Sequence, residues 1–256
     1  MYMVLAEIAS KFIISHQTSY SMYGKYKVPF EYSDDTITLS ITEDGDFFKY
    51  IRQIENEKKE QKTLLTTENA TVAINPIEPV NLPKQITQYL EIGFTPVLIE
   101  PEGLKAIYIR FPVEIGVIVF GKKKMEAVDI FSFGPQKYSL YGSPAGGVIT
   151  KYYASDIYSS PPESNRHYTG ILRLEIENKT LEWANISRTV LDGYSMKIYY
   201  GPYVSMCARM TILSPTDAET EFIRNPATSD FQKSIEIYHT RSLSSLKNTY
   251  SMEWGY

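Results

Sequence analysis

Apolar and polar residues alternate along much of the chain between residues 24 and 133, the pattern of strands with one buried face. In TITLSI, residues 36–41, isoleucine or leucine occupies every second position, with threonine and serine between. The turn sequence EDGD follows, with Gly45 where a left-handed backbone is needed. The alternation then resumes in FFKYIRQI, residues 47–54. These segments predict a β-hairpin.

The longest alternating run is LKAIYIRFPVEIGVIVF, residues 104–120. Its odd positions from 107 to 117 are all isoleucine, phenylalanine or valine and predict a core-facing side. Arg110 and Glu114 fall together on the other side. If a second domain covers them, these charges need partners, in an interdomain ion pair or a small polar pocket. Pro112 has no N–H for a sheet ladder, so we expect a bend, a bulge or a sheet edge there.

Turn residues divide the rest of the chain. The segment NPIEPVNLP, residues 75–83, carries three prolines, which predict an extended crossover and exclude a central strand. After residue 146 short strands recur at about ten-residue intervals with no helical pattern between them, as in an immunoglobulin-like sandwich. We therefore predict an all-β chain of two β-sandwich-like domains in tandem: a β domain at 22–145 and an immunoglobulin-like sandwich at 146–256.

Residues 1–21 have apolar positions at helical spacing, and we treat them as an N-terminal extension that precedes a start at Met22. A second unusual stretch is KYSLYGSPAGGVITKYY, residues 137–153. Its three glycines lack the Lys-Ser or Lys-Thr ending and the following helix of a phosphate-binding loop. We expect them to form a turn where the chain crosses from one sandwich to the next.

Composition narrows the range of partners. The net charge of −4 argues against a protein that neutralises nucleic-acid phosphates. The chain has no run of 18 apolar residues, so we expect it not to span a membrane, although a membrane-associated partner is left open. The single cysteine, Cys207, excludes an intramolecular disulfide and indicates a reducing, cytoplasmic setting. The oligomeric state is not specified.

Chemistry-bearing residues are sparse. The three histidines, His16, His167 and His239, lack zinc-ligand spacing, and we expect no metal site and no cofactor. Cys207 could pair with a histidine as a nucleophile, but its place in an apolar strand favours core packing. We assign no catalytic residue. The candidates for a ligand site or interdomain groove are Arg110, Glu114, Lys137 and Tyr141.

Several segments resemble one known family. They are MYGKYKVPF, INPIEPVNLPKQITQYLEIGF, RFPVEIGV, DIFSFGPQKYSLYGSPAGGVITKYY and GYSMKIYY. Together they resemble the archaeal family known as domain of unknown function 432, from Met22 to roughly residue 240. The resemblance implies an archaeal, intracellular source and assigns no catalytic residues.

Three functions remain open. We favour a non-enzymatic protein-binding or regulatory module that uses sheet edges or the interdomain groove. The first alternative is a carbohydrate-binding module with a platform drawn from Tyr152, Tyr153, Tyr199 and Tyr200. The second is an enzyme of unrecognised type with Arg110, Glu114 and Lys137 in the interdomain groove.

Overall fold

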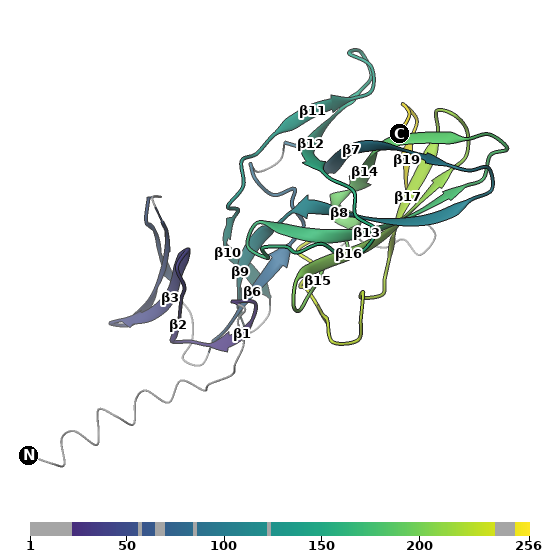
Figure 1. Ribbon diagram of the computed structural model, residues 1–256. Coiled ribbons are helices and arrows are strands. Elements are labelled where there is room, and N and C mark those ends of the chain that lie inside the picture. The colour runs from purple at the N-terminus through teal and green to yellow at the C-terminus, as the bar shows by residue number, and fades with distance from the viewer. Residues whose placement is uncertain (1–21, 56–57, 65–69, 84–85, 122–123, 239–248) are drawn as a thin grey trace, which may run out of the picture.

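The computed structural model describes residues 22–55, 58–64, 70–83, 86–121, 124–238 and 249–256. In these ranges the regular structure is β-strand apart from one short 3-10 helix, η1 (Gly193–Ser195). The strands pair into four sheets (Figure 1). The all-β class predicted from the alternating pattern is confirmed. The N-terminal extension at residues 1–21 lies outside the described residues.

The first sheet contains the predicted hairpin. Its strands, in spatial order, are β2 (Phe30–Ser33), β3 (Ile37–Asp44), β4 (Phe47–Ile54) and β5 (Glu60–Leu64). Strands β3 and β4 pair antiparallel, and Gly45 in the turn between them has φ of 63°. Every second side chain of β4, from Phe48 to Ile54, is buried. The sequence pattern therefore identified both the hairpin and its buried side.

The second sheet contains part of the proline-rich segment. Its strands are β1 (Gly24–Lys27), β6 (Thr71–Ile77), β9 (Glu114–Phe120) and β10 (Met125–Phe131). Pro76 lies in β6, an interior strand, so the prediction that the prolines exclude a central strand is wrong. In a strand, the N–H and C=O of one residue point to the same side. The carbonyl of Pro76 accepts from the Ser234 hydroxyl, so the position of the missing N–H also faces Ser234 and not a strand. Pairing with β1 ends at Ile74, so no neighbouring strand needs the missing donor.

The long alternating run is two strands in different sheets. Strand β8 (Leu104–Pro112) is at the edge of the fourth sheet, and β9 begins at Glu114 in the second. The expected interruption at Pro112 is confirmed. Arg110 and Glu114 do not share a strand face, because the chain changes sheet at Val113. Glu114 is also buried, since β9 is covered on both sides.

The third and fourth sheets contain most of the remaining chain. The third has the order β11 (Tyr138–Tyr141), β12 (Val148–Ser155), β7 (Tyr89–Ile99) and β14 (Ala184–Asp192). The fourth joins β18 (Gln232–Lys233), β15 (Tyr199–Tyr200), β16 (Val204–Ile212), β13 (Thr169–Asn178) and β8, with β17 (Ala218–Ile223) on β16 and β19 (Thr249–Met252) on β17. Strand β12 runs parallel to β7, and β13 runs parallel to β16.

The glycine-rich stretch joins β11 to β12 as a hairpin within the third sheet. The stretch therefore turns the chain within one sheet, and the crossing between two sandwiches expected here stays a prediction together with the domain division. The structural role of the glycines is supported. Gly142 has φ of 104°, and a Cβ on Gly147 would lie 2.6 Å from the carbonyl oxygen of Tyr141. Only glycine fits this tight return.

The sheets follow one another along the molecule, with the first sheet at one end, the second in the middle, and the third and fourth at the other end (Figure 1). Strands from both sides of residue 145 pair in the third sheet, because β7 and β11 precede it and β12 and β14 follow it. The tandem division at residues 145 and 146, and the immunoglobulin-like character of 146–256, remain predictions. No helix within the described ranges is long and apolar enough to cross a membrane.

Candidate functional site

Arg110 lies on β8 and faces the loop that follows β12. Its Nη2 donates to the carbonyl of Glu163 at 2.8 Å, and its Cζ lies 5.1 Å from the centroid of the Tyr158 ring. The backbone N–H of Arg110 donates to Ser155 Oγ at 2.8 Å. These contacts place the guanidinium against a loop, and they fix the end of β12 beside β8.

Glu114 is fully buried where three parts of the chain meet. One carboxylate oxygen pairs with Lys151 Nζ at 2.5 Å, and the other accepts the backbone N–H of Asn81 at 2.9 Å. Lys151 is also buried, and burial lowers the pKa of this lysine, although the neighbouring carboxylate partly offsets that effect. The ion pair connects β9 of the second sheet to β12 of the third, and the proline-rich crossover bonds to the same carboxylate. The charge partner of Glu114 is therefore Lys151 and not Arg110.

Lys137 stands at the rim of a hollow of about 280 Å³ that we call the tyrosine groove. The carbonyl of Lys137 accepts the N–H of Tyr152 at 2.8 Å, which extends the pairing of β11 with β12 by one residue pair. The groove is lined by Pro112, Ser132, Gly134, Pro135, Gln136, Lys137, Tyr152, Tyr153, Ala154, Tyr168 and Thr169. Its walls are therefore largely aromatic and apolar.

Of the four tyrosines considered as a sugar platform, two are in the core. Tyr199 is 5% exposed and Tyr200 is 8% exposed. Tyr200 packs edge-on against Tyr23, with ring centroids 5.7 Å apart. These two side chains are unavailable to a ligand, which corrects that part of the carbohydrate alternative. Tyr152 and Tyr153 are half-buried in the tyrosine groove.

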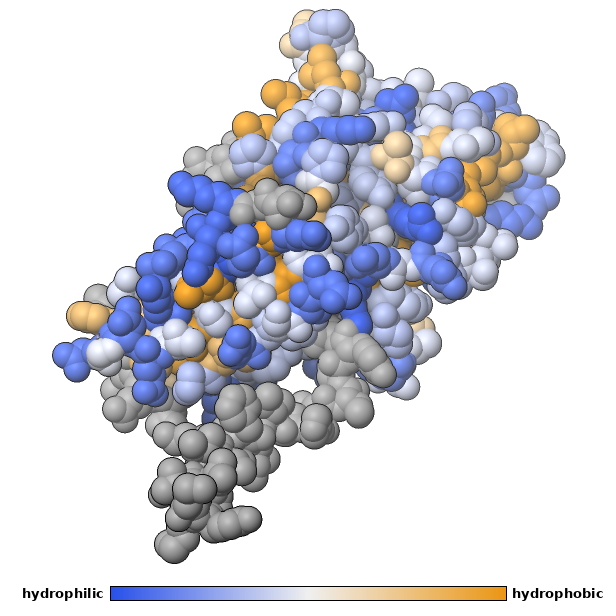
Figure 2. Space-filling view, turned by 60° about the vertical axis from the view of Figure 1, so that its left-hand side comes forward, coloured by the Kyte–Doolittle hydropathy of each residue, from blue (hydrophilic) through white to orange (hydrophobic). Residues whose placement is uncertain are grey.

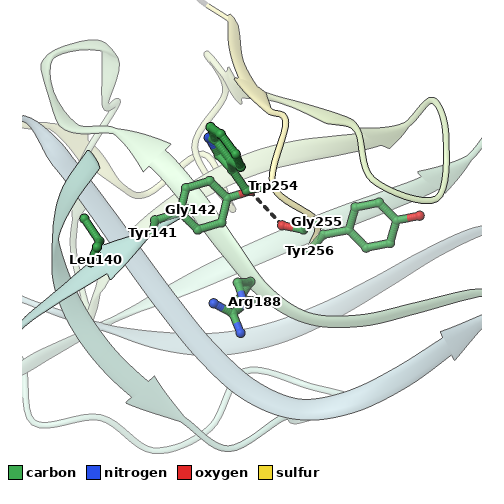
Figure 3. Close-up of a pocket in the computed structure, with 7 residues that line it drawn as sticks. All are labelled: Leu140, Tyr141, Gly142, Arg188, Trp254, Gly255 and Tyr256. Carbon is green, nitrogen blue, oxygen red and sulfur yellow. Dashed lines mark hydrogen bonds between the residues drawn. The ribbon is translucent and has the colours of Figure 1, made fainter. Parts of the chain in front are cut away.

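Tyr141 lies beside a second hollow of about 280 Å³, between the end of β11, β14 and the C-terminal residues. Its hydroxyl donates to the carbonyl of Gly255 at 2.6 Å, and burial raises the pKa of Tyr141 to about 12. Figure 3 shows the Tyr141 ring directed toward Gly255, with the Trp254 ring and the Arg188 side chain on either side. The four candidate residues thus occupy separate places and do not converge on one site.

A row of polar side chains crosses all four strands of the third sheet. Arg188 of β14 lies 3.1 Å from Glu91 of β7, whose other carboxylate oxygen accepts from Thr150 of β12 at 2.7 Å and Ser139 of β11 at 2.6 Å. Glu91 is buried, so these bonds are shielded from water. The row holds the short strand β11 firmly in register.

The outer edge of β11 is open, because in the described part of the chain only β12 pairs with β11. Residue 137 bonds to residue 152, and antiparallel partners bond at every second position. The N–H and C=O of Tyr138 and Leu140 therefore point outward. On one side of the hairpin Tyr138, Leu140 and Ile149 are 38%, 48% and 52% exposed. Apolar colour gathers on the hairpin that projects at the top (Figure 2).

Sequence reasoning missed this edge because the glycines drew attention to the turn. The alternation in YSLY, residues 138–141, was the available signal for a short strand. Pairing order cannot be read from such a pattern, so nothing in the sequence marks β11 as the last strand of its sheet.

Among the described residues, one histidine lies close to a carboxylate. His167 Nε2 lies 3.8 Å from Asp34 Oδ2, and burial lowers the pKa of His167. His167 and Asp34 line a hollow that Ser164 also lines. The Ser164 hydroxyl bonds to Thr169 and not to the histidine. His16 and His239 lie outside the described residues. Cys207 is buried and burial raises the pKa of its thiol, which confirms the core interpretation. No group of three metal-ligating residues exists among those described.

Glu78, in the crossover beside Glu114, should make the protein less stable as pH rises. Burial, together with the Glu236 carboxylate, raises its pKa from 4.5 to about 7. The folded state then holds a proton that the unfolded state releases, so stability from this group is present below pH 4.5 and is lost as pH rises to about 7. We expect Glu78→Gln to raise the free energy of unfolding by about 3 kcal/mol at pH 8.

Urea denaturation at several pH values measures this effect. The variant and the wild type should be equally stable near pH 4 and diverge as pH rises. Glu126→Gln is the matched control, because the Glu126 side chain is 67% exposed and should show no such divergence. An identical pH profile for Glu78→Gln and the wild type would contradict the assignment.

The chain matches the model of the family described as "Protein of unknown function (DUF432)" over residues 22–253. The match covers most of the chain, so the protein belongs to this family, as the sequence resemblance predicted. No curated protein and no solved structure matches the chain. The family description assigns no activity, and any function must be argued from the site itself.

Proposed function

We propose that this protein is a non-enzymatic protein-binding module that takes up an extended segment of a partner along β11. The observation that carries the proposal is the open edge of β11, where the backbone groups of Tyr138 and Leu140 point outward beside exposed apolar side chains. An edge of this kind accepts an added strand, with main-chain hydrogen bonds supplying affinity and side-chain contacts supplying specificity. The proposal includes the archaeal, cytoplasmic setting inferred from the sequence.

The shape of the hollows supports binding over catalysis. The tyrosine groove and the hollow beside Tyr141 each have a volume of about 280 Å³ and open to the surface. This volume is at the small end for an enclosed ligand pocket. The charged residues considered for an enzyme, Arg110, Glu114 and Lys137, have separate contacts. A shallow surface with a rigid open edge is better suited to a chain segment than to a small substrate.

The register of the hairpin specifies the kind of segment that fits. A strand paired with β11 would place every second side chain beside Tyr138 and Leu140, on the side of the sheet where Ile149 of β12 is also exposed. Its apolar residues should therefore recur at every second position. It should lack proline at the positions whose N–H groups face Leu140, because proline removes the donor.

Leu140→Pro tests the proposal with little change to the fold. It removes one outward-facing N–H and leaves the bonds between β11 and β12 in place. We expect a stoichiometric partner, captured with the tagged wild-type chain from its native host, to bind the variant at least about tenfold more weakly. Mass spectrometry identifies the partner, and titration with the purified partner measures the affinity.

Two controls accompany this test. Leu140→Ala keeps the N–H and removes the side chain, so it should weaken binding less than Leu140→Pro does. Leu181→Glu, at a remote loop where the leucine is 82% exposed, should bind the partner normally. Equal binding by Leu140→Pro and wild type, or a wild-type chain that captures no partner, would overturn the proposal.

A further inference from the structure

The tyrosine groove lies where β12 continues past the end of β11. Continuing the register of the two strands places Pro135 opposite Ala154, and both residues line the groove. The pairing ends at the bond from Tyr152 to Lys137, before this position is reached. Proline has no N–H to donate to a neighbouring strand, so the ladder cannot continue in full at Pro135.

Ala154 leaves two backbone groups facing the groove. The N–H of Tyr152 donates toward the β11 side, and the backbone groups of a strand face the same side at every second residue. The N–H and C=O of Ala154 therefore face the groove. Neither forms a hydrogen bond on that side with any residue that the structure describes. One donor and one acceptor are thus left for a ligand.

Gln136 adds a second acceptor to the lining of the groove. Its Nε2 donates to the carbonyl of Gly134 at 3.0 Å, which fixes the orientation of the amide. Its Oε1 is buried and has no hydrogen-bond partner among the described residues. An unpaired buried acceptor costs free energy, and a donor brought by a ligand offsets that cost. The groove therefore favours a ligand with a hydroxyl or N–H group.

The charge of the groove favours an anion. Among the described residues that line it, Lys137 alone is charged at neutral pH. The Lys137 side chain is exposed and has no ion pair within the described part of the chain. A lone cation with no acid in the same lining attracts a negatively charged group and repels a positive one.

The walls of the groove suit a flat ring and are held in place. The Tyr168 ring packs against Phe133, with ring centroids 5.1 Å apart, and the Tyr168 carbonyl accepts the N–H of Val113 at 3.1 Å. Pro112 pairs with Thr169 in the fourth sheet. A wall that is already ordered lowers the entropy cost of binding. The volume of about 280 Å³ is small for a ligand pocket and matches a ligand of one ring.

We infer that the tyrosine groove binds a small aromatic acid, a single ring that carries a carboxylate and a hydroxyl group. Lys137 and the N–H of Ala154 bind the carboxylate, and Gln136 Oε1 accepts from the hydroxyl. The tyrosine rings pack against the ring of the ligand. A neutral sugar would leave the lysine without a charge partner. The site is additional to the proposed function, because neither Tyr138 nor Leu140 lines the groove.

Isothermal titration calorimetry with meta-hydroxybenzoate and para-hydroxybenzoate tests this inference. We expect at least one of them to bind the wild-type chain with a Kd at or below about 1 mM. Three related compounds each lack one feature: benzoate lacks the hydroxyl, hydroxybenzyl alcohol lacks the carboxylate, and hydroxycyclohexanecarboxylate lacks the aromatic ring. Each should bind at least about fivefold more weakly than the hydroxybenzoate.

Substitutions assign the contacts to residues. Lys137→Met should weaken hydroxybenzoate binding at least about tenfold and leave the weak binding of hydroxybenzyl alcohol unchanged, since the alcohol has no charge to pair with lysine. Gln136→Leu should bind hydroxybenzoate and benzoate equally, because the acceptor for the hydroxyl is gone. Lys124→Met is the matched control, since this exposed lysine does not line the groove, and it should bind hydroxybenzoate normally. Thermal unfolding establishes that each variant is folded.

Three results would each overturn the inference: no binding of either hydroxybenzoate, binding of the alcohol as tightly as the acid, or equal hydroxybenzoate binding by Lys137→Met and the wild type. Binding of methyl glucoside in place of hydroxybenzoate would also overturn it and would indicate a sugar site. Leu140→Pro should bind hydroxybenzoate as the wild type does, because Leu140 lies outside the groove. The result is therefore independent of the β11 proposal.

Discussion

Replacing Lys151 with methionine should lower the free energy of unfolding by about 3–5 kcal/mol at pH 7, because it leaves a buried carboxylate without its cation. Glu114 is 0% exposed and lies 2.5 Å from Lys151 Nζ. The backbone N–H groups of Asn81 and Leu82 would still bond to it, but neither carries a charge. Urea denaturation of the purified variant measures the loss.

The pH dependence of the loss identifies its cause. Acid neutralises a buried carboxylate that has lost its cation, so the cost of the unpaired charge should shrink as the pH falls. The variant should therefore recover stability relative to wild type as pH falls toward 4. A loss that stays constant with pH would indicate damaged packing and not an unpaired charge.

Two further variants complete the comparison. Lys124→Met removes an exposed partner of Glu126, where the lysine side chain is 81% exposed, and should change stability by less than about 1 kcal/mol. Replacing both members of the buried pair, in Glu114→Leu with Lys151→Met, should recover part of the loss, since no buried charge remains. If the double variant is no more stable than Lys151→Met alone, the pair is not the origin of the effect.

The sequence allowed prediction of what depends on local alternation. The β3–β4 hairpin, its buried side and the interruption at Pro112 were predicted correctly, because a two-residue period reports burial directly. The position of Glu114 was not, because the alternating pattern continues through Val113 while the chain changes sheet. Its partner Lys151 is 37 residues further along the chain. No local pattern can identify a partner at that separation.

For the candidate site, the sequence allowed prediction of the kind of binding surface but not of its position. Sheet edges were named as a means of binding, but the edge itself depends on which strands become neighbours. Strand β12 lies between β11 and β7, although almost fifty residues separate β7 from β12 in the sequence. Pairing depends on the packing of the whole chain.

Asp129→Ala should cost a similar amount, about 3–5 kcal/mol, at the contact between the first and second sheets. Asp129 of β10 is buried and accepts from Arg52 Nε at 2.7 Å and from the Tyr50 hydroxyl at 2.8 Å. Both partners belong to β4, and the guanidinium of Arg52 lies over the Phe131 ring at 4.8 Å. The substitution removes a buried carboxylate that lies 2.7 Å from Arg52 Nε and 3.2 Å from Lys62 Nζ, and with it the charge-assisted contacts of both cations.

The loss should be concentrated in one half of the molecule. Hydrogen exchange should show amides of the first sheet losing more protection than those of the third and fourth, because the Asp129 contacts are what fix β4 against β10. Asp129→Asn should fall between the wild type and Asp129→Ala, since the amide oxygen still accepts a hydrogen bond but carries no charge. The exposed Asp35 provides the control, and Asp35→Ala should change stability by less than about 0.5 kcal/mol. Equal loss of protection in all four sheets would mean that the whole described fold unfolds as one unit and that Asp129 stabilises all of it.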